Sequence, residues 1–465
     1  MDPRSHDQPD LQTSPQSSLL ASMESADTAA PKSALSRRKL LSALGAAGLA
    51  IATGGELLTA PKQADAQAPA NTALYNVKDF GASGSQRYDF DDAPAIQSAI
   101  DTAAAYGGIV YIPAGMYFLR TPLRPRSNVT LLGAGSSSIL RAAMNKFALI
   151  SVMAAQHVTI SKLALQGTGA FNNYSMPRME CGVALEQAVD VQITDCVFSQ
   201  IDNGVVSSLS DQVYVTNCTF DSLIGTLDID TQGFGIWCSE ASRHHLESNR
   251  FNMLFQPCIT LSKGSTRSLI ANNNMTGCYQ SGVLLTAKPD EKPCELNTIS
   301  GNLIEKFKNP SNKTGYTYGI RLQGYCMDNQ IQSNTIYNIE DVGIALEGQA
   351  ANQKERPHHN HIANNVLRAA GRTGISLVNS YANQLRHNSI HESAADGIAL
   401  ATSGKDAGSY CDRNQIAHNS VNDSVKAPIR IADNRCGENI MLGNYGERNG
   451  DKIIDKGADT VTSYL

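Results

Sequence analysis

The feature that most constrains this chain is a short motif that returns every two to three dozen residues from Val158 onward. Each copy contains an apolar residue, two polar residues, usually an asparagine, one variable residue and a second apolar residue. The clearest copies have their apolar residues at Ile331 and Ile336, Ile362 and Leu367, Leu385 and Ile390, and Ile416 and Val421. A fixed period of this length is typical of a solenoid.

A second element follows each copy of the motif, a short apolar string that begins with glycine and predicts a strand. Examples are Gly319-Ile-Arg-Leu322, Gly343-Ile-Ala-Leu346 and Gly374-Ile-Ser-Leu377. Short strands cannot close a core within one repeat, but stacking the repeats buries their apolar positions in one column. We therefore predict an all-β, right-handed parallel β-helix of about a dozen coils. A leucine-rich horseshoe would need tighter leucine spacing and a helical return, and neither is present.

One column of the predicted stack is rich in asparagine. Aligning the motifs gives, between the two apolar residues, Leu163, Cys196, Cys218, Asn249, Asn273, Asn302, Asn334, Asn365, Asn388, Asn419 and Asn444. Asparagine tolerates left-handed backbone at a turn, and its amide can bond to the copies above and below. The column predicts a structural asparagine ladder, in which Cys196 and Cys218 act as small buried fillers.

Four of the ten cysteines fall on another column, each three residues before an asparagine of the repeat: Cys294, Cys326, Cys411 and Cys436. Cys294 and Cys326 belong to neighbouring predicted coils, as do Cys411 and Cys436. Adjacent rungs lie about 4.8 Å apart, within the Cα separation that a disulfide accepts. Because we expect an oxidising compartment, we predict the disulfides Cys294–Cys326 and Cys411–Cys436. A stack of reduced thiols is the alternative.

Residues 1–66 predict export. The string Ser36-Arg-Arg-Lys39 precedes an apolar stretch from Leu41 to about Leu58 that glycines interrupt, and Ala64-Asp-Ala66 is a cleavage candidate. This order indicates a removed twin-arginine signal, with the twin-arginine translocase as a partner and a periplasmic or secreted bacterial protein as the product. A chance Arg-Arg pair ahead of an uncleaved anchor is the alternative. We expect no membrane span in the mature chain, and the net charge of −5 argues against nucleic-acid binding.

Residues 67–125 differ from the repeat and predict a cap over the open end of the solenoid. A helix should follow Asp91-Asp92 and run to Ala105, with an aspartate as its cap, proline in its first turn and Gly107-Gly108 after its end. Without a lid, this end would expose strand edges. We expect the β-helix to occupy residues 126–445 and a C-terminal tail to occupy residues 446–465.

Two strings of this cap, Val77-Lys-Asp-Phe-Gly-Ala82 and Gly107-Gly-Ile-Val-Tyr-Ile-Pro-Ala-Gly115, resemble the entrance of the pectate-lyase-like β-helix superfamily. Its members include polygalacturonases, rhamnogalacturonases, alginate epimerases and phage tailspikes. Together with the signal and the repeats, the chain after residue 36 resembles a family of twin-arginine-exported β-helix-repeat proteins. The resemblance implies the fold but not the activity, because the superfamily contains enzymes, binders and structural spikes. The Gly-His-Gly and Arg-Ile-Lys signatures of polygalacturonases are missing, which argues against pectin hydrolysis.

Two coils carry long insertions, at residues 221–234 and 305–318. Insertions at one corner of a solenoid stack on one face and can wall a groove across the strands. On the strand after the second insertion, Arg321 and Tyr318 are predicted to contact substrate, because a guanidinium can bind a uronate carboxylate. They could equally only cover the β-helix surface.

The first insertion contains the residues that we predict to be catalytic, Asp228 and Asp230, with His245 further along the chain. Paired carboxylates can act as general acid and base or hold Ca²⁺, and a histidine can shuttle protons. Trp237 and Glu240 are predicted to bind substrate, since an outward tryptophan offers a face on which a sugar ring can stack. The alternative for the two aspartates is an ordinary solvated turn.

A second candidate is the string His358-His-Asn-His361, in which His358 and His361 could share a metal ion. Surface histidines on a loop more often bind nothing. No haem, flavin or iron–sulfur motif is present in the sequence, so we predict no cofactor beyond a possible Ca²⁺ at the aspartates.

Two functions fit these patterns. The first is an exported enzyme that acts on polysaccharide as a lyase, glycoside hydrolase or epimerase. The second is a non-catalytic carbohydrate-binding or cell-envelope β-helix. In both cases the expected partner is a polysaccharide, and the sequence does not indicate which one.

Overall fold

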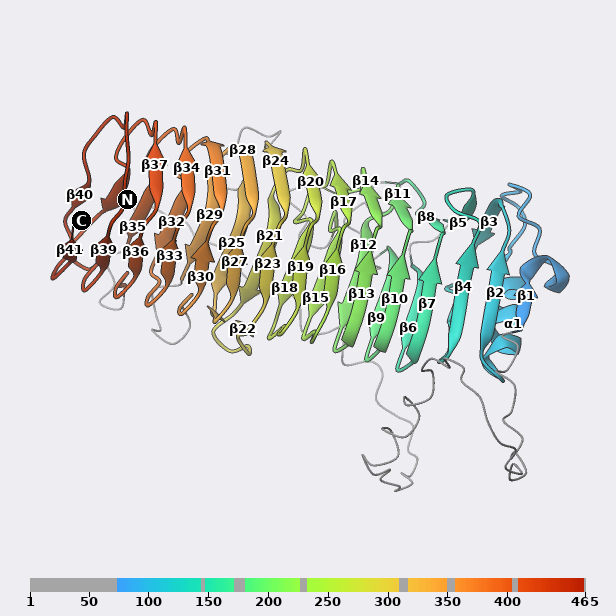
Figure 1. The fold of residues 1–465 in the computed structure, drawn as a ribbon. Coiled ribbons are helices and arrows are strands. Elements are labelled where there is room, and N and C mark those ends of the chain that lie inside the picture. The colour runs from blue at the N-terminus through green and yellow to red at the C-terminus, as the bar shows by residue number, and fades with distance from the viewer. Residues whose placement is uncertain are drawn as a thin grey trace, which may run out of the picture. The chain divides into compact units, whose positions relative to one another are not determined.

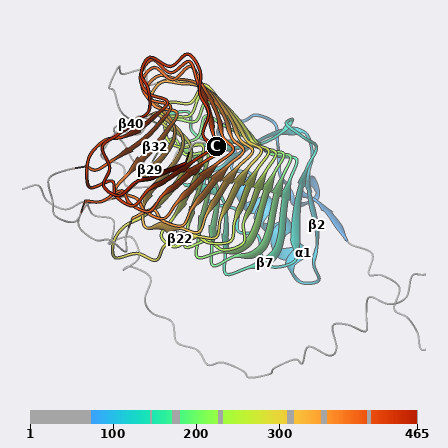
Figure 2. The same ribbon diagram turned by 60° about the vertical axis from the view of Figure 1, so that its left-hand side comes forward.

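The computed structural model describes residues 73–143, 147–170, 180–225, 232–308, 317–348, 356–403 and 409–463. The chain divides into two units, Met1–Ala68 and Pro69–Leu465, and every described residue belongs to the second. This unit is the predicted right-handed parallel β-helix. Three parallel sheets, A, B and C, gain one strand from almost every coil, so successive coils lie rung over rung (Figures 1 and 2).

Sheet A contains fifteen strands within the described residues and includes the first and last strands of the stack. They are β1 (Leu74–Asn76), β2 (Gly108–Ile112), β4 (Val129–Gly133), β7 (Gln156–Ser161), β10 (Val189–Thr194), β13 (Asp211–Thr216), β16 (His245–Glu247), β19 (Leu269–Ala271), β23 (Thr298–Ser300), β27 (Gln330–Gln332), β30 (His361–Ala363), β33 (Gln384–Arg386), β36 (Gln415–Ala417), β39 (Ile440–Leu442) and β41 (Val461–Ser463).

Sheet B follows sheet A after a tight corner and has twelve described strands. They are β3 (Gly115–Leu119), β5 (Ser138–Ala142), β8 (Ala164–Gln166), β11 (Val197–Ser199), β14 (Thr219–Asp221), β17 (Arg250–Asn252), β20 (Asn274–Thr276), β24 (Leu303–Phe307), β28 (Thr335–Ile339), β31 (Val366–Ala370), β34 (Ser389–His391) and β37 (Ser420–Asn422).

Sheet C, also of twelve described strands, completes each coil and contains the glycine-led strings of the sequence. Its strands are β6 (Ala148–Met153), β9 (Cys181–Glu186), β12 (Asn203–Ser208), β15 (Ile236–Ser239), β18 (Ile259–Ser262), β21 (Ser281–Ala287), β25 (Tyr318–Gly324), β29 (Val342–Glu347), β32 (Ile375–Val378), β35 (Ile398–Ala401), β38 (Ile429–Ile431) and β40 (Ile454–Asp455). A short pairing of β22 (Cys294–Glu295) with β26 (Cys326–Met327) lies at the corner between sheets C and A.

The two apolar residues of each motif point into the core, as the repeat predicts. Ile331 and Ile336 are 0% and 2% exposed, and the other pairs are buried to a similar degree. Phe198, Phe220 and Phe251 stack face to face, with successive ring centroids 4.6 and 4.8 Å apart. Rung-over-rung stacking therefore converts one sequence position into a continuous apolar column.

The predicted asparagine ladder is confirmed at the corner between sheets A and B. Asn334 Nδ2 donates to Asn365 Oδ1 at 3.0 Å, and the same oxygen accepts from the backbone N–H of Asn334. The left-handed residue of each corner is the residue before the asparagine, contrary to our expectation for the asparagine itself. These residues are Ser248, Asn272, Gly301, Ser333, Asn364, His387, His418 and Gly443.

A second asparagine ladder, which the sequence analysis missed, lies at the corner between sheets C and A. Asn297, Asn329, Asn360, Asn383, Asn414 and Asn439 repeat the same amide-to-amide bonds at 3.0 to 3.2 Å. Here too the preceding residue has positive φ, as in His359 before Asn360. Each later coil is thus tied to the next at two corners.

The structure brings the paired cysteines together as expected but does not join them. Cys294 and Cys326 are partners in the β22–β26 register, and the Cys411 N–H donates to the carbonyl of Arg435, next to Cys436. All ten cysteines are buried free thiols in the structure, so neither predicted disulfide is formed in it. Cys196 and Cys218 are buried in the ladder column, as predicted.

A helix caps the first coils, as predicted, with one difference at its start. α1 spans Ala93–Ala104 and buries Ile96 and Ile100, and the one-turn 3₁₀ helix η1 spans Val77–Phe80. The Asp92 side chain makes no capping bond. It is buried and instead accepts from the backbone of Ser83 at 2.5 Å and of Phe118 at 3.1 Å. The aspartate therefore fastens the preceding loop and β3 to the cap.

At the other end, residues of the expected tail add strands to the stack: β40 pairs with β38, and β41 pairs with β39.

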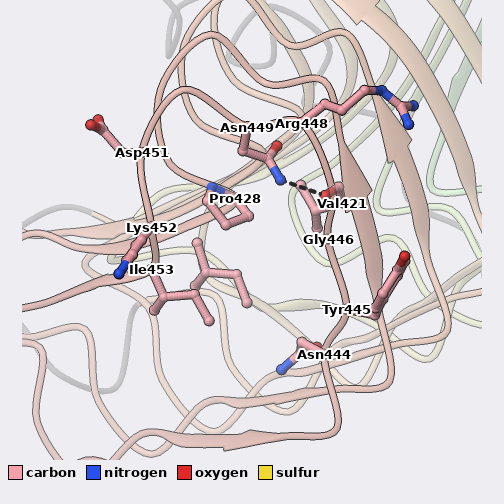
Figure 3. Close-up of a pocket in the computed structure, with 11 residues that line it drawn as sticks. Val421, Pro428, Asn444, Tyr445, Gly446, Arg448, Asn449, Asp451, Lys452 and Ile453 are labelled. Carbon is pink, nitrogen blue, oxygen red and sulfur yellow. Dashed lines mark hydrogen bonds between the residues drawn. The ribbon is translucent and has the colours of Figure 1, made fainter.

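A cavity of about 590 Å³ opens beside the last coil (Figure 3). Pro428 and Ile453 line it, and Asn449 Nδ2 donates to the carbonyl of Val421 at 2.9 Å. It is an opening at the end of the core. Neither helix among the described residues has the length and hydropathy of a bilayer-crossing segment.

Candidate functional site

The candidate site lies on the outward face of sheet C. Alternate residues of a strand point to opposite faces, and the register aligns Trp237, Thr260, Leu284 and Arg321 on four consecutive strands, β15, β18, β21 and β25. Trp237 and Arg321 are thus three rungs apart, roughly 14 Å at the usual strand spacing. Two of the predicted substrate-binding residues therefore share one column.

Three polar side chains converge at one end of this column. Arg321 Nε donates to Glu347 Oε2 at 2.8 Å, and the Tyr318 hydroxyl donates to Glu347 Oε1 at 3.3 Å. The Arg321 guanidinium also lies over the Tyr318 ring, 4.4 Å from its centroid. We call Tyr318, Arg321 and Glu347 the polar cluster. A carboxylate and a phenol can act as general base and acid, and a guanidinium can bind an anion.

Tyr318 is the most buried member of the polar cluster. Its ring packs with Val342 and Ala345 in a small apolar cluster separate from the main core. Burial raises the pKa of Tyr318 to about 12, and the Glu347 carboxylate adds to this effect although Arg321 opposes it. At neutral pH the hydroxyl is therefore protonated and acts as a donor.

Trp237 forms the other end of the column. Its indole stacks on Phe234 with centroids 4.8 Å apart, and Nε1 donates to Ser262 Oγ at 3.4 Å. Thr260, on the adjacent strand, is 3% exposed, and its Oγ1 has no hydrogen-bond partner within the described chain. This end of the column thus combines an aromatic face with an unsatisfied buried hydroxyl.

The structure separates the remaining predicted residues. Glu240 is exposed with φ 50° in the corner after β15. His245 lies on sheet A, where its ring stacks on Tyr214 at 4.9 Å and its Nδ1 bonds to Glu247 at 3.0 Å. The corner between Glu240 and His245 turns the chain from sheet C to sheet A. His245 and Trp237 consequently belong to different sheets, although they are close in sequence.

The two predicted catalytic aspartates, Asp228 and Asp230, lie outside the described residues. Within the described ranges, no three His, Cys, Asp or Glu side chains form a group that could hold a metal ion. The possible Ca²⁺ at the aspartates therefore stays a prediction.

Glu347 is the member of the polar cluster that the sequence analysis did not select. The aligned strings Gly319-Ile-Arg-Leu-Gln323 and Gly343-Ile-Ala-Leu-Glu347 place it in register with Gln323, two positions beyond Arg321, on the neighbouring strand. Reading the outward positions of adjacent strands diagonally would have found the Arg321–Glu347 pair.

The comparisons with known proteins agree with this architecture. The family described as rhamnogalacturonase A/epimerase, pectate lyase-like, matches residues 74–284, and the family described as periplasmic copper-binding protein (NosD) matches residues 294–461. The A-module of mannuronan C-5 epimerase AlgE6 from Azotobacter vinelandii has a TM-score of 0.57 at 17% identity, over 84% of this chain and 98% of that module. Over residues 74–284 the chain is thus similar to pectate-lyase-like proteins, and its fold is that of a parallel β-helix.

Two further relatives are similar over different extents. Mannuronan C5-epimerase AlgE5 of Azotobacter vinelandii is 51% identical over 69 residues, which are 13% of this chain and only 7% of that protein. The tailspike of Escherichia coli bacteriophage HK620, solved with a pentasaccharide, has a TM-score of 0.59 at 13% identity, over 84% of this chain and 81% of that one. The chain is thus a β-helix protein with carbohydrate-related homologues.

Proposed function

We propose that this protein binds an acidic polysaccharide along the outward face of sheet C and modifies it at the polar cluster. The observation that carries the proposal is the convergence of Tyr318, Arg321 and Glu347 at the Arg321 end of the column that begins with Trp237. Relatives named as mannuronan epimerases and an alginate lyase support a charged polymer. The activity we propose is that of a lyase, epimerase or glycoside hydrolase.

Each member of the polar cluster has a distinct role in this proposal. Arg321 uses Nε and Nη2 to bind Glu347, and a guanidinium has five N–H donors, so its other edge remains available to a substrate carboxylate. Tyr318, protonated at neutral pH, donates a proton or hydrogen bond to a sugar oxygen. When the substrate carboxylate binds Arg321, Glu347 is released from Arg321 and becomes available as a proton acceptor.

The proposal also includes export of the protein and a role for the two aspartates of the first insertion. The twin-arginine signal in residues 1–66 would deliver the folded chain to the periplasm or outside the cell, and one matched family is described as periplasmic. Asp228 and Asp230, which precede β15 in the sequence, stay the proposed catalytic carboxylates. A sugar ring stacked on Trp237 would then place neighbouring sugars near Arg321.

A panel of polyuronates and neutral polysaccharides tests this function. Binding is measured by calorimetry, and products are detected by ultraviolet absorbance for unsaturated ends and by NMR for epimerised or hydrolysed sugars. We expect Arg321→Gln to weaken polyuronate binding at least about tenfold, because a charged hydrogen bond is lost. Tyr318→Phe should keep binding and lose turnover. Arg386→Gln removes an arginine from sheet A, where Nη2 donates to Gln415 at 2.7 Å, and is the matched control.

The second candidate function is a non-catalytic carbohydrate-binding β-helix. The existing Arg321–Glu347 pair favours it, since it already neutralises the cation without a ligand. Binding that depends on Arg321, with no product from wild type or from the Asp228→Ala/Asp230→Ala variant on any polymer, would select this function. Equal binding by wild type and Arg321→Gln would reject the site altogether.

A further inference from the structure

Two buried cysteines outside the pairs predicted from the sequence meet at the corner between sheets B and C. Cys258 Sγ donates to Cys278 Sγ at 3.2 Å, and both residues are 0% exposed. The thiol-to-carbonyl hydrogen bonds of the described chain measure 3.4 to 3.7 Å, although oxygen is a smaller atom than sulfur. The two sulfur atoms are therefore in close contact.

Backbone hydrogen bonds between neighbouring coils fix the position of this contact. The Cys258 N–H donates to the carbonyl of Ser281 at 3.0 Å. The N–H of Tyr279, next to Cys278, donates to the carbonyl of Leu254 at 2.9 Å. The segment before β18 therefore lies directly against the segment before β21, and each cysteine is held beside one of these bonds.

Two further side-chain contacts join the same two segments. The rings of Phe255 and Tyr279 have centroids 4.8 Å apart and an interplanar angle of 54°. Gln280 Nε2 donates to Gln256 Oε1 at 3.0 Å. The separation of the two sulfurs is thus set by a packed corner with several contacts, and not by the rotamer of a single side chain.

We propose that Cys258 and Cys278 form a disulfide when the chain is oxidised. An S–S bond is about 2.05 Å long, so bond formation shortens a separation that is already only 3.2 Å. The two cysteines are 20 residues apart and are joined through β18, β19 and β20, one strand of each sheet. The disulfide therefore closes one complete coil into a covalent ring. The proposal is independent of the proposed polysaccharide function.

The oxidant in this proposal is a small-molecule disulfide. One cysteine thiolate attacks the disulfide of the oxidant, which releases one thiol and leaves a mixed disulfide on the protein. The second cysteine then attacks the mixed disulfide and releases the other half of the oxidant as a thiol. The protein loses two thiol hydrogens and gains one S–S bond, while the oxidant takes up both electrons and both protons.

The reaction takes place while the corner is open. Burial raises the pKa of the Cys258 thiol well above its usual value, so the packed corner contains almost no thiolate at this position. Transient separation of the two segments exposes both thiols to the oxidant. Once the bond has formed and the corner has packed again, burial protects it from reduction in the same way.

The bond has a defined place relative to sheet C. In that sheet, β18 and β21 lie between β15 and β25, the strands into which the two long insertions lead. The disulfide ties the coil of Thr260 to the start of the coil of Leu284. These are the two middle residues of the column that runs from Trp237 to Arg321.

Non-reducing peptide mapping of the full chain tests the proposal. The chain is incubated with oxidised glutathione just below its urea midpoint, where coils open transiently, and its free thiols are then alkylated in concentrated urea. Cleavage by chymotrypsin after Phe255 and Tyr279 separates Cys278 from Cys294, so that each pairing gives its own mass. We expect a linked pair of peptides that contains Cys258 and Cys278.

Variants provide the second measurement. A disulfide around a loop of this length should raise the folding equilibrium constant roughly a hundredfold. The oxidised chain should therefore exceed the reduced chain in urea midpoint by more in wild type than in Cys258→Ala or Cys278→Ala. Cys238→Ala removes an equally buried thiol from the neighbouring strand, and as the matched control it should keep both the linked peptides and the gain.

Three results would overturn the proposal. The first is recovery of Cys258 and Cys278 as separate alkylated peptides after oxidation. The second is linkage of either residue to a different cysteine. The third is an equal gain in urea midpoint on oxidation for wild type and Cys258→Ala. The first two need only the wild-type chain, so they decide the question even if an alanine variant does not fold.

Discussion

Arg321 and Glu347 form an ion pair on adjacent strands of sheet C, with Nε donating to Oε2 at 2.8 Å. The side chains are 21% and 26% exposed, so the pair is screened by solvent only in part. In the proposed function, a substrate carboxylate would compete with Glu347 for the guanidinium of Arg321.

We predict that Glu347→Gln binds polyuronate more tightly and turns it over more slowly. A partly exposed ion pair contributes up to about 1 kcal/mol, so affinity measured by calorimetry should rise by up to about fivefold. The product assay should show lower turnover because the acceptor is lost. Glu392→Gln, which breaks the similar Arg368–Glu392 pair at 2.8 Å on sheet B, should change neither quantity. A matching gain in that control would contradict the prediction.

We predict that Asn334→Ala destabilises the β-helix by about 3 kcal/mol, because the carbonyl of Ile299 and the N–H of Asn302 each lose a buried partner. The lowered urea midpoint should show this. Gln332→Ala, two residues earlier on the outward face of sheet A, should have almost no effect. Equal midpoints for the two variants would show that the ladder amides do not stabilise the stack.

We predict that acid weakens the fold through His244. Burial lowers the pKa of His244 to about 4 in the folded chain, against 6.5 without burial. The unfolded chain therefore takes up a proton at a higher pH than the folded chain does. The stability from this group is complete above about pH 6.5 and is lost as the pH falls to about 4, a change of about 3 kcal/mol.

Urea unfolding at pH 7.5 and 4.5 measures this effect. His244→Gln should lose less stability than wild type between the two values, because it removes the titrating ring that Ser207 and Ser242 hold at 2.9 and 3.0 Å. His245→Gln, at the half-exposed neighbour, should follow wild type. If His244→Gln and wild type lose stability equally, another group causes the acid sensitivity.

We predict that the exported protein forms the Cys294–Cys326 disulfide, because the two residues are register partners on adjacent strands. Non-reducing peptide mapping after oxidation should recover the linked peptides. Cys181 and Cys238 should stay reduced, since burial raises their pKa values to about 12. Recovery of Cys294 and Cys326 as free thiols would show that the loops there hold the sulfurs apart.

The sequence predicts the fold well because the β-helix converts position in a repeat directly into position in space. The apolar pairs and the ladder from Asn249 to Asn444 follow from one alignment. The left-handed residue was assigned wrongly, since asparagine is a frequent left-handed residue and only the hydrogen bonds show that its amide is used elsewhere. Asp92 was misjudged for a similar reason, because its carboxylate bonds to Ser83 and Phe118, far away in sequence.

The site was harder to predict than the fold. Trp237, Arg321 and Tyr318 share sheet C because all three follow the glycine-led pattern, which the sequence displays. His245 was grouped with them by proximity in sequence, although a corner turns it onto sheet A. Glu347 was overlooked because its contact with Arg321 crosses between strands, and only an alignment of neighbouring glycine-led strings brings the two residues together.

The two ladders make each later coil, from Asn297 onward, an interchangeable module. A coil inserted with both asparagines, and with a residue before each that accepts left-handed backbone, would present the same amides to its neighbours as the coil it displaces. Duplication or loss of whole coils can therefore lengthen or shorten sheet C without any new corner. If sheet C binds polysaccharide as proposed, the number of sugar units that it holds can change during evolution without any change to the polar cluster.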